Sequence, residues 1–386
     1  MQPLRSARVR DVLLIGDSER SMELRHEIPV AIGDPFAYAE VGGRRLVTVS
    51  SLERDNVLAA APDVELRPVE GYKAEELVAA GLDLYAIWPE LCARFARDVG
   101  LTRVVVPETF PVVHADRLRQ DGITIDVDQR FFDDRRRAKT PTEIDGISRA
   151  QRAAEAGMEA VRTMLRRSEP GDGGRVLDGE PLTCELLKRT ATDAFDRHGC
   201  RGDELIVARG PQGASGHDRG SGRVANDDVL VCDLFPRHLA SGCFADMTRT
   251  FAVGGVEPEI ADWHAQCLEA LELAVSLARP GADGAAIHAA VDGFFAERGH
   301  PTNLTKPVGA VLRDGFFHST GHGVGLEVHE APYIGRTGHV FVPGDVIALE
   351  RGLYRHGFGG VRIENLVLVT DTGHEVLTDF PYDLVP

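Results

Sequence analysis

The sequence predicts a two-domain protein of mixed α/β (α+β) class. Its 386 residues exceed one compact core, because cores stop growing near about 250–300 residues. Short runs of branched apolar residues, such as 12–15 and 46–49, alternate with stretches of helical spacing. A charged run at 133–139 is typical of a linker, and a strong helix start follows it. We therefore expect one domain at 1–138 and a second at 139–386.

The second domain begins with a helix signal. Thr140 can cap the helix, Pro141 suits its first position, and Glu143 lies three residues after Thr140, which closes a capping box. Helical spacing continues to Arg167. Further helices are expected at 184–198, 258–278 and 284–298. Strands are expected at 104–106 in the first domain, and at 205–208, 229–233, 244–253, 346–350 and 360–369 in the second.

Composition excludes several classes of partner. The net charge of −17 arises from 60 acidic and 43 basic side chains, and such a field repels phosphate backbones and anionic headgroups. Neither nucleic acid nor a membrane surface is therefore expected as a partner. No run approaches the about 18 apolar residues of a membrane helix, and residues 1–10 precede only a short apolar run. The six cysteines form no CxxC pair, which favours reduced thiols and the cytoplasm.

Two aspartates stand at the ends of apolar strands. The run 229–232 ends on Asp233, and a buried carboxylate must be paired or must coordinate a cation. Asp246 lies on the expected partner strand, so a hairpin would point both carboxylates into one pocket. The alternative is structural: Asp233 caps a turn and Asp246 pairs with Arg249.

Three histidines form a second cluster. His318, His322 and His329 fall within twelve positions, among glycines that let backbone segments approach closely. A single histidine is more often a core or surface residue than a ligand, but this clustering reverses that weighting. A fourth histidine, His217, lies in an earlier glycine-rich loop.

Two glutamates are embedded in apolar strands. Glu350 closes the run 346–349, and Glu364 follows Arg362 by two positions on the strand 360–369. A surface pair between Arg362 and Glu364 would contribute little to stability. Such a pair also leaves unexplained why both glutamates interrupt apolar sequence.

These clusters together indicate a site for divalent metal ions. Like charges so dense cannot ionise together without a compensating cation. An oxygen-rich donor set with one nitrogen suits Mn, Co, Fe or Zn. Two metals about 3.5–4 Å apart can bridge a hydroxide and polarise a carbonyl, as in metal-assisted amide hydrolysis. The histidines outside the metal shell would bind substrate and move protons. The expected metal ligands are Asp233, Asp246, His322, Glu350 and Glu364.

The chain resembles the pita-bread metallopeptidases over roughly residues 139–386. The segments that carry the resemblance are VCD, ADMTRTF, HSTGHGVGLEVHE, ALERGLY and GGVRIEN, in this order. The family includes methionine aminopeptidase, aminopeptidase P, prolidase (Xaa-Pro dipeptidase) and the metal-free relative creatinase. The resemblance implies a pita-bread catalytic domain and a creatinase-like α/β domain at 1–138. The extra domain favours the proline-specific branch, Xaa-Pro dipeptidase or Xaa-Pro aminopeptidase, acting as a homodimer on small proline-containing peptides.

The resemblance also assigns roles to the metal ligands. Asp233 is implied to be the bidentate ligand of one ion, and Asp246 and Glu364 to bridge both. His322 and Glu350 would complete the shell of the other ion. Glu350 would also act as the general base or acid for the bridging water.

The resemblance places four further residues around the substrate. His217 matches a histidine beside the substrate, and His329 matches one that contacts the scissile carbonyl or its tetrahedral intermediate. His318 and Arg362 match positions that the proline-specific branch uses around the substrate.

Two departures from the family pattern stand out. The hairpin 235–244 is about two residues longer than is common, which changes the edge of the pocket. Arg351 stands where relatives usually have proline, and it could add a charge near the metal site.

Other functions remain open at this point. A metal-dependent hydrolase of non-prolyl substrates, or a lyase of the same fold, would use the same ligands on a small molecule. A catalytically inactive peptide-binding module is a further alternative. Creatinase-like members lose the metal ligands, whereas all five are present in this chain.

Overall fold

The structure is a computed structural model that describes residues 10–386. The chain divides into two compact units, the first ending at Arg136 and the second beginning at Arg137. Residues 1–9, which belong to the segment considered above for a signal peptide, lie outside the described part. Across residues 10–386, no helix has the length and apolar character that spanning a membrane requires.

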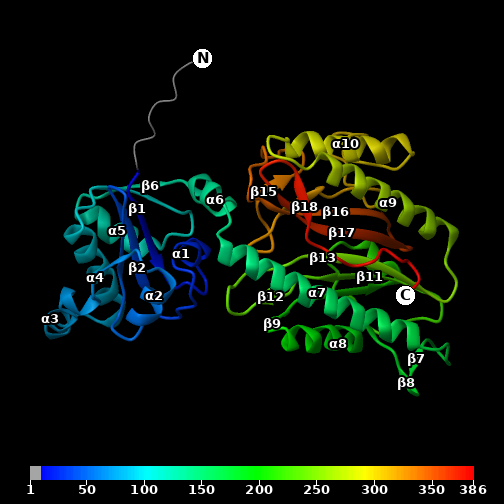
Figure 1. Ribbon diagram of the computed structural model, residues 1–386, viewed down its shortest axis with the longest axis horizontal. Coiled ribbons are helices and arrows are strands. Elements are labelled where there is room, and N and C mark those ends of the chain that lie inside the picture. Colours follow the sequence, from blue (N-terminus) through cyan, green and yellow to red (C-terminus); the bar gives the residue numbers. More distant parts are fainter. Residues whose placement is uncertain (1–9) are drawn as a thin grey trace, which may run out of the picture. The chain divides into compact units, whose positions relative to one another are not determined.

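The first unit is a mixed six-stranded sheet with helices on both faces (Figure 1). The strand order is β4-β3-β2-β1-β5-β6, with β1 antiparallel to β2 and parallel to β5. Its elements are β1 (Val12–Gly16), α1 (Met22–Glu27), β2 (Phe36–Val41), β3 (Arg44–Thr48), α2 (Arg54–Ala60), β4 (Glu65–Leu66), the 3₁₀ turn η1 (Val69–Tyr72), α3 (Ala74–Ala79), α4 (Leu84–Asp98), β5 (Arg103–Val106), α5 (Val112–Gln120), β6 (Thr124–Val127) and α6 (Gln129–Arg137).

Alternation along β1 builds two cores, one on each face of this sheet. Leu14 packs with Leu24 of α1, whereas Leu13 packs with Phe95 of α4. Successive strand residues point to opposite faces, so a run of continuous apolar residues is needed when both faces are covered. The three strands expected from such runs are present as β1, β3 and β5.

The charged segment 133–139 differs from the expectation. Its first part is helical, because α6 runs from Gln129 to Arg137, so the linker expected there was wrong. Gln129 Nε2 donates to Asp133 Oδ1 at 2.9 Å, one turn away. Side chains four residues apart support a helix in this way, and Phe132 buries the apolar side of the helix.

The second unit holds two larger antiparallel sheets between pairs of helices, together with two small two-stranded sheets (Figure 1). One sheet has the order β10-β11-β13 and the other β15-β14-β16-β17-β18. Its elements are α7 (Pro141–Arg167), β7 (Val176–Leu177), β8 (Glu180–Pro181), α8 (Cys184–Arg197), β9 (Cys200–Arg201), β10 (Ile206–Arg209), η2 (Gly210–Ala214), β11 (Asp228–Leu234), β12 (Arg237–His238), β13 (Met247–Val253), α9 (Pro258–Leu277), α10 (Gly284–Glu297), β14 (Gly321–Gly323), β15 (Glu330–Ile334), β16 (Val346–Arg355), β17 (Gly359–Val369) and β18 (His374–Val376).

Helix α7 begins as the sequence indicates. Thr140 Oγ1 accepts from Glu143 N at 3.2 Å, and Thr140 N donates to Glu143 Oε2 at 2.8 Å, which completes the capping box. The helices expected at 184–198, 258–278 and 284–298 are present as α8, α9 and α10.

The larger sheet separates an apolar face from a polar one. Leu349 of β16 and Ile363 of β17 join Trp263 of α9 and Phe295 of α10 in one buried core. Because strand residues alternate, the neighbouring residues of β16 and β17 turn to the opposite face. That opposite face, which lies toward β11 and β13, is where the candidate site forms.

The packing of α7 on α8 depends on a glycine. A Cβ added at Gly157 would lie 2.4 Å from Cε1 of Phe195, a fully buried ring. We predict that Gly157→Ala lowers the free energy of unfolding by about 1–3 kcal/mol, because an overpacked core must shift. Gly293 of α10 is the matched control, since a Cβ there meets nothing within 4 Å. Gly293→Ala should stabilise by about 0.5–1 kcal/mol through helix propensity. Urea denaturation of both variants checks this, and equal effects would contradict the close contact.

Candidate metal centre

Strand pairing brings the expected metal ligands together. Glu350 of β16 and Glu364 of β17 are direct cross-strand partners. Asp233 of β11 lies opposite Thr248 of β13, and Asp246 directly precedes β13. His322 of β14 pairs with Ala348 of β16, two residues before Glu350. The hairpin expected from β11 and β13 is therefore present, and the ligands come from β11, β14, β16 and β17 and from the residue that precedes β13.

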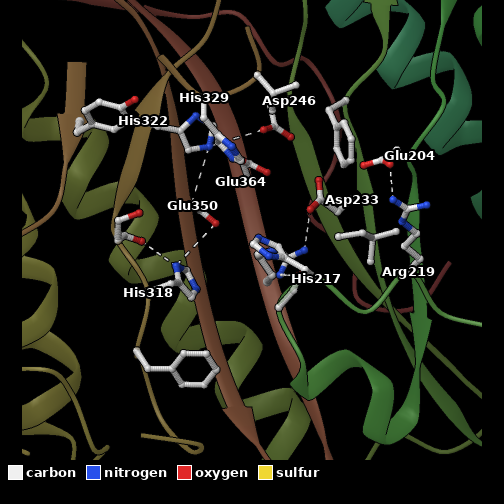
Figure 2. Close-up of a pocket in the computed structure, with 18 residues that line it drawn as sticks. Glu204, His217, Arg219, Asp233, Asp246, His318, His322, His329, Glu350 and Glu364 are labelled. Carbon is white, nitrogen blue, oxygen red and sulfur yellow. Dashed lines mark hydrogen bonds and ion pairs between the residues drawn. The ribbon is translucent and has the colours of Figure 1, made fainter. Parts of the chain in front are cut away.

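One cavity of about 950 Å³ contains the whole set (Figure 2). Every residue singled out from the sequence for metal or substrate lines it, although the role of each remains a prediction. They are His217, Asp233, Asp246, His318, His322, His329, Glu350, Arg362 and Glu364.

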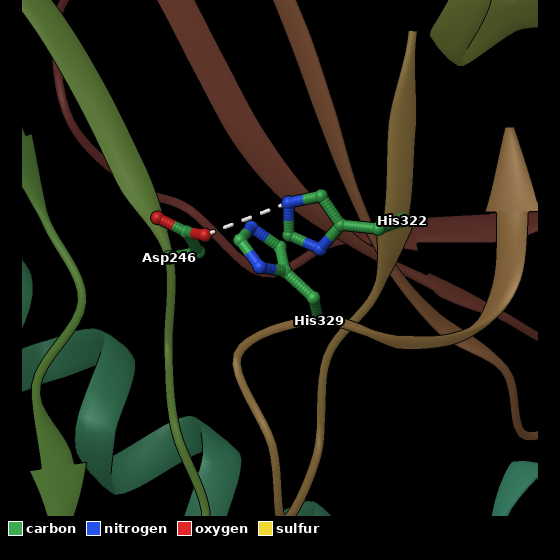
Figure 3. A group of neighbouring side chains, drawn as sticks. All are labelled: Asp246, His322 and His329. Atoms are coloured by element: carbon green, nitrogen blue, oxygen red, sulfur yellow. Dashed lines mark ion pairs between the residues drawn. The ribbon is translucent and has the colours of Figure 1, made fainter. Parts of the chain in front are cut away.

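The ligand atoms fall into two groups that share Asp246. Asp233, Asp246 and Glu364 each offer an oxygen within 4.8 Å of the others. An oxygen of Asp246 and a ring nitrogen of each of His322 and His329 also lie within 4.8 Å of one another, and Figure 3 shows the two rings facing the Asp246 carboxylate. His322 Nε2 lies 3.7 Å from Asp246 Oδ2 and 3.9 Å from Glu350 Oε1. The ring of His329, expected beside the substrate, thus also lies within reach of a metal.

Electrostatics in the cluster match a cation site. The pKa of Asp246 and of Glu364 is raised well above the ordinary carboxyl range, first by burial and then by the neighbouring carboxylates. Burial would also raise the pKa of Glu350, but His318, His322 and Arg362 outweigh it and lower that pKa. Carboxylates in this arrangement repel one another, and a bound cation would relieve the repulsion.

Two buried oxygens in the cluster lack protein partners. Among the described residues, Asp233 Oδ1 and Asp246 Oδ1 accept no hydrogen bond although both atoms are buried. Buried polar atoms in proteins are nearly always satisfied, so orphaned carboxylate oxygens indicate a missing ligand. The donor set of four carboxylates and an imidazole fits a hard or borderline divalent metal.

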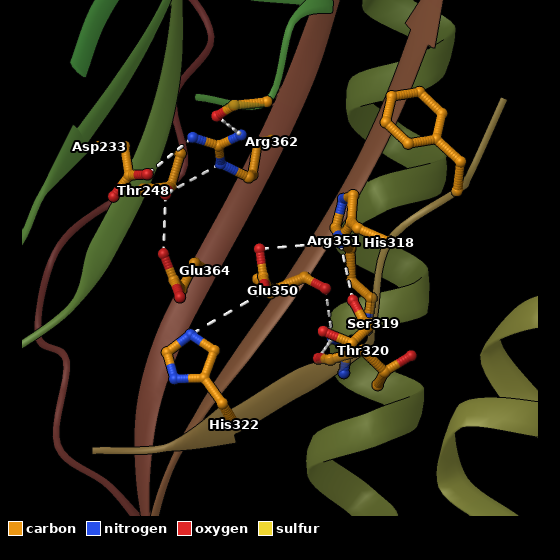
Figure 4. Close-up of polar contacts among 12 residues, drawn as sticks. Asp233, Thr248, His318, Ser319, Thr320, His322, Glu350, Arg351, Arg362 and Glu364 are labelled. Atoms are coloured by element: carbon orange, nitrogen blue, oxygen red, sulfur yellow. Dashed lines mark hydrogen bonds and ion pairs between the residues drawn. The ribbon is translucent and has the colours of Figure 1, made fainter. Parts of the chain in front are cut away.

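Other side chains hold the carboxylates in place (Figure 4). Arg362 Nη2 donates to Asp233 Oδ2 at 2.7 Å, and Thr248 Oγ1 donates to Glu364 Oε2 at 2.7 Å. Arg362 is thus buried against Asp233, and the surface pair with Glu364 considered from the sequence is wrong. Each hydrogen bond orients its carboxylate and uses one lone pair of one oxygen, so both oxygens keep a lone pair for a metal.

Arg249 likewise does not pair with Asp246. Its Nη1 donates to Glu364 O at 2.7 Å, and its Nη2 donates to Phe380 O at 2.9 Å. The fully buried guanidinium therefore ties β13 to β17 through main-chain carbonyls. The structural alternative for Asp246 is contradicted by this geometry.

Tyr354 and Thr248 also contact residues of the site, and the sequence analysis did not single them out. Tyr354 OH lies 3.0 Å from His318 Nε2 and accepts from Arg362 Nη1 at 3.4 Å. Strand alternation could have identified Tyr354, because a residue four positions after Glu350 lies on the same face of β16. Gly352 lies between them, and a Cβ there would come within 2.1 Å of the Tyr354 hydroxyl. Thr248 could have been found likewise, two residues after Asp246.

Arg351 lies behind the site, on the helix-covered face of β16. Its Nη1 donates to Glu350 O at 2.6 Å and also to Thr320 O. Burial lowers the pKa of Arg351 to about 9, and its charge contributes to the lowered pKa of Glu350. The departure from proline therefore adds a positive charge behind the cluster, as considered from the sequence. The longer hairpin contributes Phe235 to the cavity wall.

A profile of the family described as metallopeptidase family M24 matches residues 145–371. A probable dipeptidase, PepE, of Mycobacterium bovis is 34% identical over 252 residues, which is 65% of this chain and 60% of the relative. The Xaa-Pro dipeptidase of Pyrococcus furiosus is 31% identical over 254 residues, 65% of this chain and 66% of that protein.

Solved structures share the fold over nearly the whole chain. The Xaa-Pro dipeptidase of Bacillus anthracis has a TM-score of 0.78 at 23% identity and covers 97% of this chain and 94% of its own. An X-Pro aminopeptidase of Thermotoga maritima has a TM-score of 0.75 at 22% identity, with 98% and 95% covered. The chain therefore belongs to metallopeptidase family M24, a family that uses divalent metal ions, and its second unit has the pita-bread fold.

A buried ion pair supports the strand that follows His329. Lys139 Nζ contacts Glu330 Oε1, with side chains only 2% and 5% exposed. A Cβ at Gly325 would meet Glu330 Oε1 at 2.5 Å and Lys139 Nζ at 2.8 Å, so this glycine leaves room for the pair. The pair therefore fixes the loop that carries His329.

We predict that Lys139→Met lowers the free energy of unfolding by about 3–5 kcal/mol, because it leaves the buried Glu330 charge without this partner. Lys139→Met combined with Glu330→Gln should cost clearly less than the single change. Lys73→Met is the control, since its pair with Glu76 is exposed (65% and 59%) and should matter by less than about 0.5 kcal/mol. Urea denaturation of these variants, of the Glu330→Gln single variant and of wild type checks the coupling; strictly additive losses would show that the pair is not the cause.

Proposed function

We propose that this protein is a two-metal peptidase that hydrolyses Xaa-Pro peptide bonds, of the Xaa-Pro dipeptidase or Xaa-Pro aminopeptidase type. The observation that carries the proposal is the sharing of Asp246 by two groups of ligand atoms, since a shared carboxylate suits a pair of bridged ions. The names of the relatives support the proline-specific branch. The alignment covers only 60% of the first of these relatives, so the activity of the whole protein is part of the proposal.

The roles of the proposed ligands follow the family resemblance, and the two groups of ligand atoms that share Asp246 support them. Asp233 would hold one ion through both oxygens, and Asp246 and Glu364 would bridge the two. His322 and Glu350 would complete the other shell. Two divalent ions, Mn, Co, Zn or Fe, would supply an activated water and polarise the scissile carbonyl.

The surroundings of Glu350 support a role in proton transfer. Its Oε2 lies 3.7 Å from His318 Nδ1, and its Oε1 lies 3.9 Å from His322 Nε2, so the carboxylate faces the cavity between two imidazoles. We propose that Glu350 accepts a proton from the attacking water and returns it to the departing proline nitrogen.

Histidines on two sides of the cluster would hold the peptide. His217 and His329 line the cavity from different loops, and each could donate to the scissile carbonyl or to the oxyanion that replaces it. Arg362 lines the same cavity, where it donates to Asp233 Oδ2 at 2.7 Å and to Gly216 O at 3.3 Å, next to His217. Binding and orientation by these groups would bring the peptide bond against the cluster.

An aromatic wall beside Glu350 suits a proline ring. The rings of Phe317 and Tyr354 lie 5.0 Å apart, and the rings of Phe316 and His318 lie 4.9 Å apart. Phe317, His318 and Tyr333 line the cavity. The pyrrolidine ring of proline is apolar and its peptide nitrogen carries no hydrogen, so it can pack here without leaving a buried donor unpaired.

We also propose a cellular location, a domain type and an oligomeric state for the protein. All six cysteines are free and buried, which supports the reducing cytoplasm. We further propose that residues 1–138 form a creatinase-like domain and that the protein is a homodimer, both on the strength of the family resemblance. Sedimentation analysis would test the dimer.

Metal binding should stabilise the wild-type protein. A ligand held only by the folded state adds about 2.7 kcal/mol at a hundredfold excess over its Kd. We therefore predict that Mn²⁺ added to chelator-treated protein raises its Tm and binds at two ions per chain by metal analysis. Asp246→Asn should lose both effects, whereas the exposed helix variant Asp145→Asn should keep them. Retention of stoichiometric metal by Asp246→Asn would overturn the ligand set, and absence of metal from wild type would favour a binding module.

Activity should require Glu350 and proline. We predict that metal-reconstituted protein releases free proline from Ala-Pro, and that Glu350→Gln lowers kcat by about 10²–10⁴-fold because proton transfer is lost. Metal content must be measured alongside, since Glu350 is also a proposed ligand. Ala-Ala is the control peptide, and Glu259→Gln, on an exposed ion pair with Arg355, is the control variant. Turnover of Ala-Ala but of no Xaa-Pro peptide would support a non-prolyl hydrolase, and turnover of no peptide would leave a lyase.

A further inference from the structure

Arg351 is a buried cation that the proposed mechanism does not use. Its side chain is fully buried behind the cluster, at a position where relatives usually have proline. Its Nη1 donates to Glu350 O at 2.6 Å and to Thr320 O, whereas its Nε and Nη2 meet no partner among the described residues (Figure 4). Burying a guanidinium with unused donors costs free energy. Its presence therefore needs an explanation other than stability.

The hydrogen bonds between β14 and β16 end beside Glu350. Gly321 lies opposite Leu349, so Thr320 and Glu350 form the next pair along the two strands. In an antiparallel ladder, the two residues of a hydrogen-bonded pair exchange both N–H···O bonds. Here Glu350 N donates to Thr320 O at 3.1 Å, but Thr320 N donates to Ile334 O of β15 at 2.8 Å. The carbonyl of Glu350 therefore does not receive the donor that this pairing would supply.

Arg351 supplies a donor in its place. A single nitrogen, Nη1, contacts both Glu350 O and Thr320 O, so it joins the two strands where their own pairing is incomplete. Proline has no donor that could do this. Thr320 is also held from its other side, since its Oγ1 lies 2.9 Å from Nδ1 of the buried His288 on α10. We call Arg351 and Thr320 together the clamp.

The clamp joins the strand of one proposed ligand to the segment of two imidazoles. Thr320 lies midway in the sequence between His318 and His322. Glu350 Oε1 is 3.9 Å from His322 Nε2, and its Oε2 is 3.7 Å from His318 Nδ1. Arg351 and Thr320 are outside the set of described residues that line the cavity, so they act through these neighbours. Groups that orient metal ligands from behind typically change metal affinity or activity by about 10- to 100-fold when they are removed.

We propose that Arg351 is a positioning residue, which with Thr320 holds the Glu350 carboxylate beside the His322 ring. The proposal rests on the proposed two-metal peptidase function and deepens it, because it gives a role to a residue in which this chain departs from its relatives. The ion held by His322 and Glu350 depends on the clamp, and so does proton transfer by Glu350. Binding of the peptide does not depend on it.

Metal titration of the full chain tests the clamp. Chelator-treated wild type, Arg351→Met, Arg351→Lys and Thr320→Val are titrated with Co²⁺ by calorimetry, and kcat and KM for Ala-Pro are measured at saturating Co²⁺. Arg175→Met is the matched control. Arg175 is 8% exposed, and its guanidinium donates to the main-chain carbonyls of Ser168 and Asn226, among described residues that do not line the cavity.

Arg351→Met should weaken one of the two Co²⁺ binding steps about 10- to 100-fold and change the other less than about threefold. With metal saturating, kcat should fall about 10- to 100-fold while KM changes less than about threefold, because Glu350 is displaced and the groups that bind the peptide are not. Arg351→Lys should recover part of both losses, since an ammonium donates to a carbonyl but lacks the planar fork. Thr320→Val should show a smaller loss at the same binding step. Arg175→Met should change no binding step and no kcat by more than about threefold.

Equal weakening of both binding steps by Arg351→Met would overturn the proposal, because a purely structural role would not distinguish the two ions. So would no weakening of either step, or the same losses in Arg175→Met. If Arg351→Met does not fold, Thr320→Val decides: a single weakened step supports the clamp, and two unchanged steps overturn it. The proposed function fails separately, since wild-type protein would then bind Co²⁺ but release no proline from any Xaa-Pro peptide. In that case the titrations still decide the role of Arg351.

Discussion

The close approach of buried carboxylates is the constraint around which the second unit is organised. Glu350 and Glu364 face each other across two paired strands, where like charges oppose folding. Asp233 and Asp246 add two more from the neighbouring sheet. Burial and mutual repulsion raise the pKa of Asp246 and Glu364, so without a cation the cluster is kept from full ionisation. A bound divalent cation would relieve this repulsion, so the arrangement suits a metal ion.

The surrounding structure keeps those groups from relaxing apart. Arg249 joins β13 to β17 through main-chain carbonyls, while Thr248 and Arg362 each hold one ligand oxygen. On the reverse face, α9 and α10 bury the alternate residues of β16 and β17, which prevents the strands from turning. A one-residue slip would exchange the acidic and apolar faces, so packing the core also orients the ligands.

The two sides of the cavity differ in chemistry: one is aromatic and the other is charged. An aromatic wall, including Phe317, stands beside Glu350, and an exposed ion pair at Arg219 lies beyond Asp233. A metal pair alone would favour hydrolysis without choosing among peptides. The flanking walls therefore carry the chemistry by which one peptide could be distinguished from another, and both are built from residues outside the cluster.

By itself the sequence determined which groups could form a metal site, because a carboxylate inside an apolar strand is a local signal with a physical cost. It also determined the capping box of α7 and most strands, which depend on neighbouring residues. Only the tertiary structure decided that Arg362 pairs with Asp233 rather than Glu364, and that Arg219 faces the same cavity. Those contacts join positions far apart in the chain, and no local pattern specifies which distant partner a buried charge meets.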